Sequence, residues 1–258
     1  MSQEEQIDDP GMTFWEHLEE LRSRLLKMGA ATLCGGVGAW FLKERILNWL
    51  VGPFSTAWQQ QGFKQKPQLH FPNPAGLFIA YIKLTVISGM LMAMPVIFYQ
   101  LWAFIAPGLY AKEKRFALPF VFISTLLFAA GAYFGMAVAF PAGFQYLLGF
   151  AGHLPDFDIE PTIMVDDYVE FIARSLIAFG AVFELPVVVF FLTIAGVVNH
   201  THLLKFFRYF VVVAFIISAV LTPPDILSQF LLAVPLILLY CVSIVIAWAF
   251  NRKKASVA

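Results

Sequence analysis

Glu184 is the residue whose type and position most clearly suggest a chemical role. It lies within the apolar stretch AVFELPV at 181–187, where a carboxylate facing lipid would cost at least ~2.5 kcal/mol. We therefore expect Glu184 to face a cavity or a partner. The alternative is a structural hydrogen bond with a backbone carbonyl that Pro186 leaves unpaired.

Two other carboxylates, Glu20 and Glu113, lie in polar segments that border apolar runs. One interpretation is ordinary surface pairing, with Glu20 bound to Arg24 at i,i+4. The other is a pair of acidic sockets for a cationic ligand at the membrane edge. Arginine would suit such sockets, because its planar guanidinium binds a carboxylate through two hydrogen bonds.

The other reactive residue types form no recognisable site. His200 and His202 make a lone H-x-H in a loop, and Cys34 and Cys241 lie inside apolar runs, where small buried hydrophobes are common. The sequence contains no G-x-S-x-G, H-E-x-x-H, Walker A or Rossmann glycine pattern. We predict neither an enzyme nor a metal or cofactor site.

Composition indicates an all-α polytopic membrane protein. Of the 258 residues, 60% are hydrophobic and 13% are charged, whereas a soluble domain carries roughly 25% charge. The apolar residues gather in runs close to the ~20 residues that cross a bilayer. The formal net charge is zero, which leaves no basic surface for nucleic acid.

We expect one domain, residues 1–258, with six transmembrane helices. The second span has about thirty residues, more than a crossing needs, so we expect tilt, a kink at Pro95 or a helix that projects from the bilayer. Pro141 should interrupt the third span. The fifth span has about 16 residues, or roughly 24 Å, so we predict a thinned bilayer beside the hairpin of the fifth and sixth helices. The expected spans are about 25–42, 76–105, 116–150, 168–195, 206–221 and 226–250.

The segments outside the spans carry further expectations. Residues 44–61 should form an interfacial helix anchored by Trp49, Phe54 and Trp58. Lys83 and Arg174 should snorkel from the outer ends of their spans. The non-spanning segments are 1–24 (N-terminal region), 43–75 (first outer loop), 107–115 (first cytoplasmic loop), 151–167 (second outer loop) and 251–258 (tail).

Basic residues predict the orientation, because cytoplasmic loops carry an excess of Lys and Arg. With six spans, one side holds eleven of these residues and the other holds four. Both termini are therefore expected in the cytoplasm.

Four motifs, in order, resemble the TatC family, the receptor core of the twin-arginine protein translocase. They are HLEELRSR at 17–24, PVIFYQLWAFIAPGLYAKEKR at 95–115, FELPVVVFFL at 183–192 and LTPPDILSQFLLAVPLILLY at 221–240. The resemblance covers nearly the whole chain. It implies short fifth and sixth helices and a location in the cytoplasmic (inner) membrane of a prokaryote.

The resemblance also implies a function and its residues. The chain would bind twin-arginine signal peptides of folded cargo at the cytoplasmic face. It would recruit single-span subunits of the TatA and TatB type, assemble with copies of itself, and support export driven by the proton-motive force. The implied residues are Glu20, Glu113, Phe104, Glu19 and Arg22 for the signal peptide, Glu184, Thr222 and Gln229 for the partner helix, and Pro53, Pro95, Pro107, Pro223, Pro224 and Asp225 for structure. Asp225 could equally be a turn residue that caps the sixth helix.

Two other functions are possible for such a chain. A secondary transporter or ion carrier could use Glu184 as its proton or cation site. The sequence, however, shows no repeat symmetry of the kind that many transporters have. An intramembrane hydrolase would need a nucleophile paired with a base, which the sequence lacks.

Overall fold

The computed structural model describes residues 14–63, 65–105, 117–153, 158–159, 161–221 and 225–255, and helices dominate this part of the chain. The helices are α1 (Phe14–Phe41), α2 (Lys43–Gln60), α3 (Gly76–Met92), α4 (Met94–Ile105), α5 (Ala117–Phe134), the π-helical turn η3 (Gly135–Ala139), α6 (Phe140–Leu148), α7 (Val165–Phe183), α8 (Leu185–Ile194), α9 (His200–Leu221) and α10 (Ile226–Ala255). The strands are β1 (Leu69–His70), β2 (Gly152–His153), β3 (Asp158–Ile159) and β4 (Ile163–Met164).

By length and composition, the described residues give four continuous candidate spans, and six when each of two bent helix pairs counts as one span. The continuous segments are Leu118–Leu148, Val165–Ile194, His200–Leu221 and Ile226–Phe250. The bent pairs are α1 with α2, at 85°, and α3 with α4, at 56°. The chain is therefore an all-α polytopic membrane protein, as its composition predicts.

Proline shapes three of these segments. The 56° bend between α3 and α4 lies directly before Pro95, which confirms the predicted kink. Before Pro141 the chain forms η3, so the third span is modified by a π-helical turn and continues into α6. Since proline has no N–H to donate, the helix must change its hydrogen bonding at each of these positions. The third case is Pro186, which is the second residue of α8 and lies two residues after Glu184.

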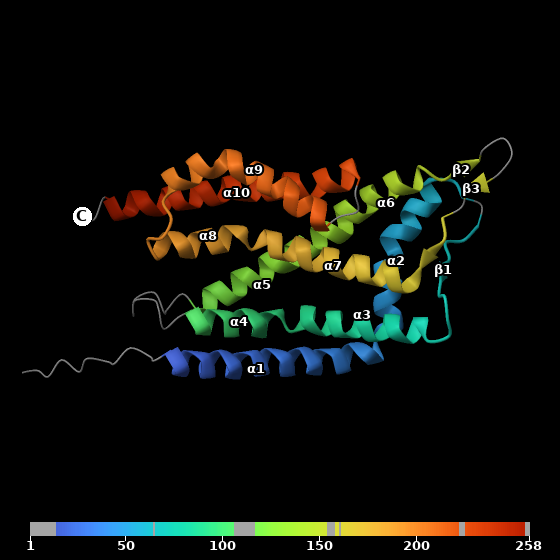
Figure 1. The fold of residues 1–258 in the computed structure, drawn as a ribbon, viewed down its shortest axis with the longest axis horizontal. Helices are drawn as coiled ribbons and strands as arrows, with labels where there is room; N and C mark the ends of the chain where they lie inside the picture. Colours follow the sequence, from blue (N-terminus) through green and yellow to red (C-terminus); the bar gives the residue numbers. More distant parts are fainter. Residues whose placement is uncertain are drawn as a thin grey trace, which may run out of the picture.

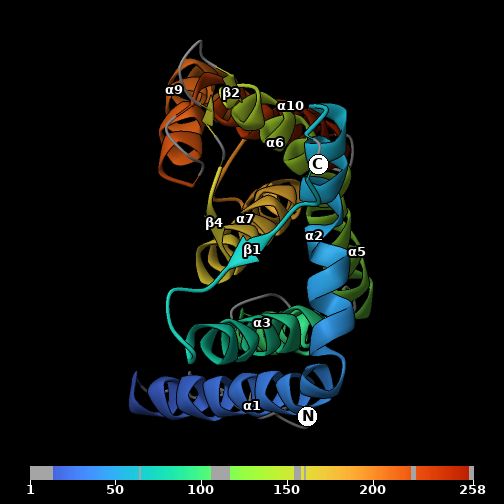
Figure 2. The ribbon, with the colours of Figure 1, turned by 90° about the vertical axis from the view of Figure 1, so that its right-hand side faces the viewer.

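The helices share two ends, visible in Figure 1. At one end α1 begins, α4 ends, α8 leads into α9, and α10 ends. We call this the basic end, because α1 and α9 carry Arg22, Arg24, Lys27, Lys205 and Arg208 there. At the opposite, capped end, α2 runs across the bundle from the level of α1 and α3 to that of α10 (Figure 2).

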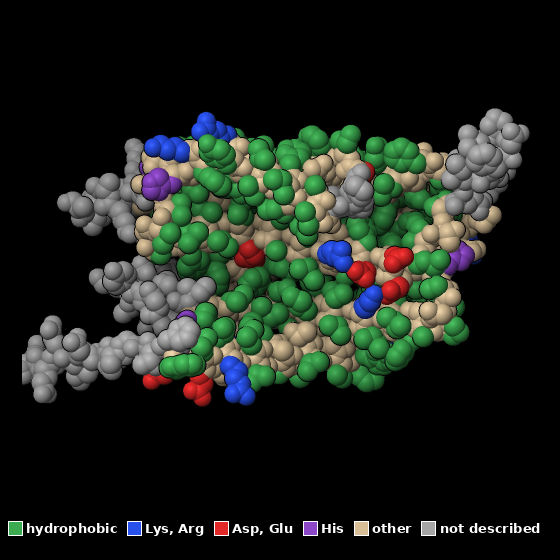
Figure 3. Space-filling view, viewed as in Figure 1, with side chains coloured by type: hydrophobic (Ala, Val, Ile, Leu, Met, Phe, Trp, Pro, Cys, Tyr) green, Lys and Arg blue, Asp and Glu red, His purple; other side chains and the backbone are tan. Residues whose placement is uncertain are grey.

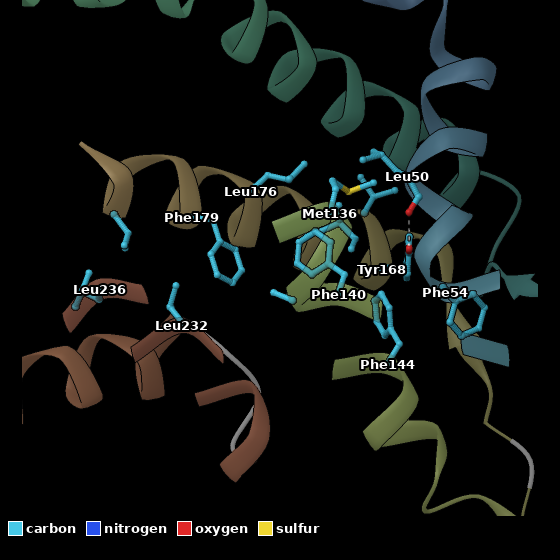
Figure 4. Close-up of a cluster of buried hydrophobic side chains, with 14 of the residues drawn as sticks. Leu50, Phe54, Met136, Phe140, Phe144, Tyr168, Leu176, Phe179, Leu232 and Leu236 are labelled. Atoms are coloured by element: carbon cyan, nitrogen blue, oxygen red, sulfur yellow. Dashed lines mark hydrogen bonds between the residues drawn. The ribbon is translucent and has the colours of Figure 1, made fainter. Parts of the chain in front are cut away.

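The core lies where α2, α6 and α7 meet (Figure 4). Phe54 and Trp58 of α2 are 0% and 7% exposed, so the expectation that both anchor the membrane interface is wrong. Their rings pack into the protein, where Phe54 contacts Phe144 and Tyr168. Trp49 is 59% exposed and is the one of the three that remains available to lipid. Pro53 lies inside α2, directly before the buried Phe54.

Two short pairs of strands join the loops at the capped end. β1 of the 43–75 segment pairs in parallel with β4 of the 151–167 segment, with Leu69 opposite Ile163. β2 and β3 pair in antiparallel within the second segment. Tyr168 adds a hydrogen bond of 2.7 Å from its hydroxyl to the Leu50 carbonyl, which ties α7 to α2. The 43–75 and 151–167 segments are therefore tied together at the capped end.

The α9–α10 hairpin is present as expected. Its two candidate spans are the shorter of the continuous segments, with 22 and 25 residues against 31 and 30, although α10 as a whole has 30 residues. The fifth helix is longer than the 16 residues predicted, because it begins at His200. Its 22 residues span about 33 Å. Only the apolar part of the helix, about residues 206–221, is shorter than the hydrocarbon core. Tyr240 stacks on Phe210 and donates a hydrogen bond to the Leu203 carbonyl at 2.9 Å, which holds the hairpin together.

Candidate functional site

The first turns of α1 and the last turns of α4 bring several polar and aromatic side chains together at the basic end. Glu20 on α1 has a side chain that is 17% exposed. Arg24, one turn further on, donates from Nε to Glu20 Oε1 at 3.0 Å and also from Nη2 to the same oxygen. Its Nη1 donates to Gln100 Oε1 of α4 at 3.3 Å. The predicted i,i+4 pair is thus real, and α4 holds it from the side.

The second carboxylate oxygen of Glu20 remains available. Oε2 is buried and makes no hydrogen bond within the described part of the chain. His17 Nδ1 lies 3.8 Å from it, and the His17 ring stacks on Phe104 of α4 with centroids 4.4 Å apart. We call Glu20, Arg24, Gln100, His17 and Phe104 the Glu20 cluster.

Sequence reasoning found three members of this cluster and missed His17 and Gln100. His17 lies three residues before Glu20, and Gln100 lies four residues before Phe104. Both spacings put side chains on one face of a helix, and this signal could have identified them. Glu19 and Arg22, which were expected in the same site, are exposed and outside the cluster.

Several expected site residues lie outside the described ranges: Glu113 and Pro107 of the segment between α4 and α5, and Thr222, Pro223 and Pro224 of the segment before α10. Their assignments remain expectations from the family resemblance.

Glu184 occupies the joint between α7 and α8. Its backbone, at φ −75° and ψ −11°, ends one helix and begins the next. The side chain is half-buried and faces the Ser124 hydroxyl and the backbone of Phe128 on α5. Oε1 of Glu184 and Oγ of Ser124 are both buried, and neither forms a hydrogen bond of good geometry among the described residues. This leaves an acid inside the bundle with unused hydrogen-bonding capacity.

The polar residues at the start of α10 serve the hairpin. The backbone N–H of Ser228 donates to Asp225 Oδ1 at 2.8 Å, so Asp225 is the N-cap of α10. Gln229 donates from Nε2 to the Phe215 carbonyl of α9 at 3.0 Å. Its amide nitrogen is therefore engaged within the protein, while Asp225 fulfils the capping role that the sequence suggested for it.

A charged network on α3 and α7 was not foreseen. Lys83 Nζ lies 2.9 Å from Asp166 and 3.1 Å from Glu170, and Arg174 lies 2.5 Å from Glu170. Lys83 and Arg174 therefore do more than extend toward the interface, because both pair with acids of α7; that they snorkel stays a prediction. Figure 3 shows acidic and basic side chains gathered within an otherwise mainly hydrophobic face.

Metal binding has no support in the described residues, which contain no group of three or more His, Cys, Asp or Glu arranged to hold an ion. Fold and site together define a polytopic helical membrane protein with a guanidinium-binding carboxylate at one end and an acid within a broken helix.

The family model for the Sec-independent protein translocase protein (TatC) matches residues 16–235. Sec-independent protein translocase protein TatC of Desulforapulum autotrophicum is 40% identical, over 94% of this chain and 87% of its own length. The TatC proteins of Carboxydothermus hydrogenoformans and Aquifex aeolicus are 37% and 35% identical, over 97% and 95% of this chain and 98% and 99% of their own lengths.

A crystal structure described as that of the twin-arginine translocase receptor TatC has the same fold. It superimposes with a TM-score of 0.77 at 36% identity, covering 91% of this chain and 99% of its own. The chain belongs to the TatC family. It is a multi-pass membrane component of the Sec-independent protein translocase, and its role is in protein transport.

Proposed function

We propose that this chain is the receptor subunit that binds twin-arginine signal peptides, and that the Glu20 cluster receives one of the two arginines. The observation that carries the proposal is that Glu20 already binds a guanidinium, that of Arg24. The carboxylate is partly shielded from water, at 17% exposure, and shielding strengthens a charge-assisted hydrogen bond. A peptide arginine would bind Oε2 directly or replace Arg24 at Oε1.

Glu113 is the second socket in this proposal. It lies in the loop that follows α4, and α4 contributes Gln100 and Phe104 to the Glu20 cluster. A pair of carboxylates suits a pair of arginines, and Phe104 offers an apolar surface beside them. The basic end of the bundle is then the cytoplasmic face, with both termini on that side, as the excess of Lys and Arg predicts.

Recruitment of single-span partners is assigned to Glu184, with Thr222 and Gln229 at the hairpin. Glu184 Oε1 is buried without a hydrogen bond in the described structure, so a polar group on a partner helix would satisfy it. Within hydrocarbon such a contact is favoured, because the alternative for each group is to stay unsatisfied. Family membership favours this reading over the secondary transporter, in which Glu184 would carry the transported ion.

The test is binding of a twin-arginine signal peptide to the purified protein in nanodiscs, against the same peptide with two lysines. We expect the arginine peptide to bind at least about tenfold more tightly, because lysine cannot form the bidentate pair. Glu20→Gln and Glu113→Gln should each remove most of this preference. Glu44→Gln, an exposed acid on α2 at the capped end, is the matched control.

The variant Arg24→Gln tests whether Arg24 competes with the peptide for Glu20. It frees Glu20 from its internal guanidinium, so we expect tighter binding of the arginine peptide. Weaker binding would mean that Arg24 positions Glu20 and does not compete with the ligand. Binding that ignores both arginines, or that survives Glu20→Gln and Glu113→Gln unchanged, would refute the receptor proposal.

A further inference from the structure

A buried serine on α5, Ser124, is not among the residues that the proposed function uses. The residue is 0% exposed, and its Oγ forms no hydrogen bond of good geometry within the part of the chain that the structure describes. A buried hydroxyl without a partner is costly, because it has given up its hydrogen bonds with water. Its surroundings therefore show which group it serves.

Other hydroxyls in these helices bond to their own backbone. Thr125, the next residue, donates to the Val121 carbonyl at 2.7 Å. Ser218 and Ser243 donate to the carbonyl four residues before them at 2.8 and 2.7 Å. This is the usual bond of a serine or threonine inside a helix. Ser124 does not make it, so its hydroxyl stays available to a group on another helix.

The packing of α5 on α7 determines what Ser124 faces. Ser124, Phe128 and Gly131 share one face of α5, because they are spaced at i, i+4 and i+7. An added Cβ at Gly131 would overlap the Phe179 carbonyl oxygen, and one at Gly180 would lie 2.5 Å from the Phe128 ring. Such close contacts allow the two helices only one register.

This register brings Ser124 to Glu184. Contacts that move backward along α5 move forward along α7, so the helices are antiparallel. Ser124 lies four residues before Phe128, and Glu184 lies four residues after Gly180, the contact of Phe128. The Glu184 side chain accordingly faces the Ser124 hydroxyl. Oε1 of Glu184 is buried and, among the described residues, has no hydrogen bond of good geometry either. A donor and an acceptor thus meet in the interior, and each lacks another partner there.

We propose that Ser124 is a positioning residue for Glu184: its hydroxyl donates to the carboxyl group and fixes the direction in which that group meets a partner helix. The inference rests on the proposed role of Glu184 in recruitment. Each carboxyl oxygen can accept two hydrogen bonds, so a bond from Ser124 leaves capacity for the partner. Holding the side chain in one rotamer beforehand lowers the entropic cost of binding.

The first experiment is infrared spectroscopy of the full chain in nanodiscs. The Glu184 carboxyl band is the one that Glu184→Gln removes. Ser124→Ala should shift this band, because the carboxyl loses its donor, whereas Ser124→Thr keeps the hydroxyl and should leave the band nearly in place. An unshifted band in Ser124→Ala would overturn the proposal.

The matched control for this spectrum is Ser175→Ala on α7. Ser175 is 3% exposed, and its Oγ also makes no hydrogen bond within the described ranges. Its replacement removes a comparable buried hydroxyl, and the Glu184 band should not move. A shift equal to that of Ser124→Ala would mean that the band reports a general change in packing, and the proposal would be wrong.

The second experiment measures co-purification of single-span subunits. Ser124→Ala should reduce the retained subunits by roughly two- to tenfold, the effect expected for one hydrogen bond. Ser124→Thr should restore most of the loss, and Ser175→Ala should cause none. Full retention by Ser124→Ala, in a preparation where Glu184→Gln loses its partners, would show that Ser124 does not position Glu184 for recruitment.

The two experiments also separate this inference from the proposed function. If Glu184→Gln retains its partners, recruitment by Glu184 is refuted. The infrared band then decides by itself whether Ser124 holds the acid, since that measurement needs no partner.

Discussion

The imidazole of His17 stacks on the ring of Phe104, with centroids 4.4 Å apart and 20° between the planes. The contact joins the first turns of α1 to the last turns of α4, across 87 residues of sequence. It also places the imidazole beside the carboxylate oxygen of Glu20 that has no hydrogen bond. Through this stack, Phe104 of α4 is linked by His17 to the carboxylate of Glu20.

We predict that His17 and Phe104 act together in signal-peptide binding. His17→Ala and Phe104→Ala should each weaken binding, and the double variant should lose less than the sum, with a coupling of about 1 kcal/mol, as expected for an aromatic pair. Titration of the four proteins with the twin-arginine peptide measures this coupling. Strictly additive losses would show that the stack does not contribute to the site.

Gly89→Ala should destabilise the protein by about 1–3 kcal/mol, the usual effect of overpacking. A Cβ at Gly89 would overlap the backbone of Gly36 on α1, where α1 and α3 pack closely. Thermal unfolding in detergent measures the loss. Gly29→Ala on α1 is the control, because nothing lies within 4 Å of its added Cβ. If the two variants unfold alike, the close approach of α1 and α3 is not needed for stability.

Lys83→Met should lower the thermal midpoint, because it leaves Asp166 without its basic partner and Glu170 with Arg174 alone. The added change Asp166→Asn should restore part of the loss by removing the unpaired charge. Lys205→Met, an exposed lysine on α9, should have little effect. A midpoint for Lys83→Met equal to that of the control would mean that the network adds nothing to stability.

Glu184→Gln should leave stability unchanged or improved while it reduces partner recruitment. The amide keeps the shape of the side chain and carries no charge at any pH, so it costs no more to bury than the acid does. Thermal unfolding reports the first effect, and co-purification of single-span subunits reports the second. A lower midpoint with undiminished co-purification would assign Glu184 a purely structural role.

Local patterns in the sequence determined most of the architecture. Runs of apolar residues predicted the six spans, because crossing hydrocarbon requires a minimum helix length. Pro95 predicted a bend, since proline cannot donate the helical hydrogen bond. The spacing of Glu20 and Arg24 predicted their pair, because residues four apart meet on one helix face.

Only the tertiary structure decided which surfaces meet. Phe54 and Trp58 look the same in sequence whether they face lipid or protein, and the packing of α2 on α6 and α7 buries them. Lys83 donates a hydrogen bond to Asp166, which is 83 residues away in the sequence, and His17 stacks on Phe104. Both contacts form because helices distant in the sequence lie side by side. Ser124 likewise faces Glu184 only because α5 packs against α7. Helix length and local spacing are fixed by nearby residues, whereas these contacts depend on how the whole bundle fills space.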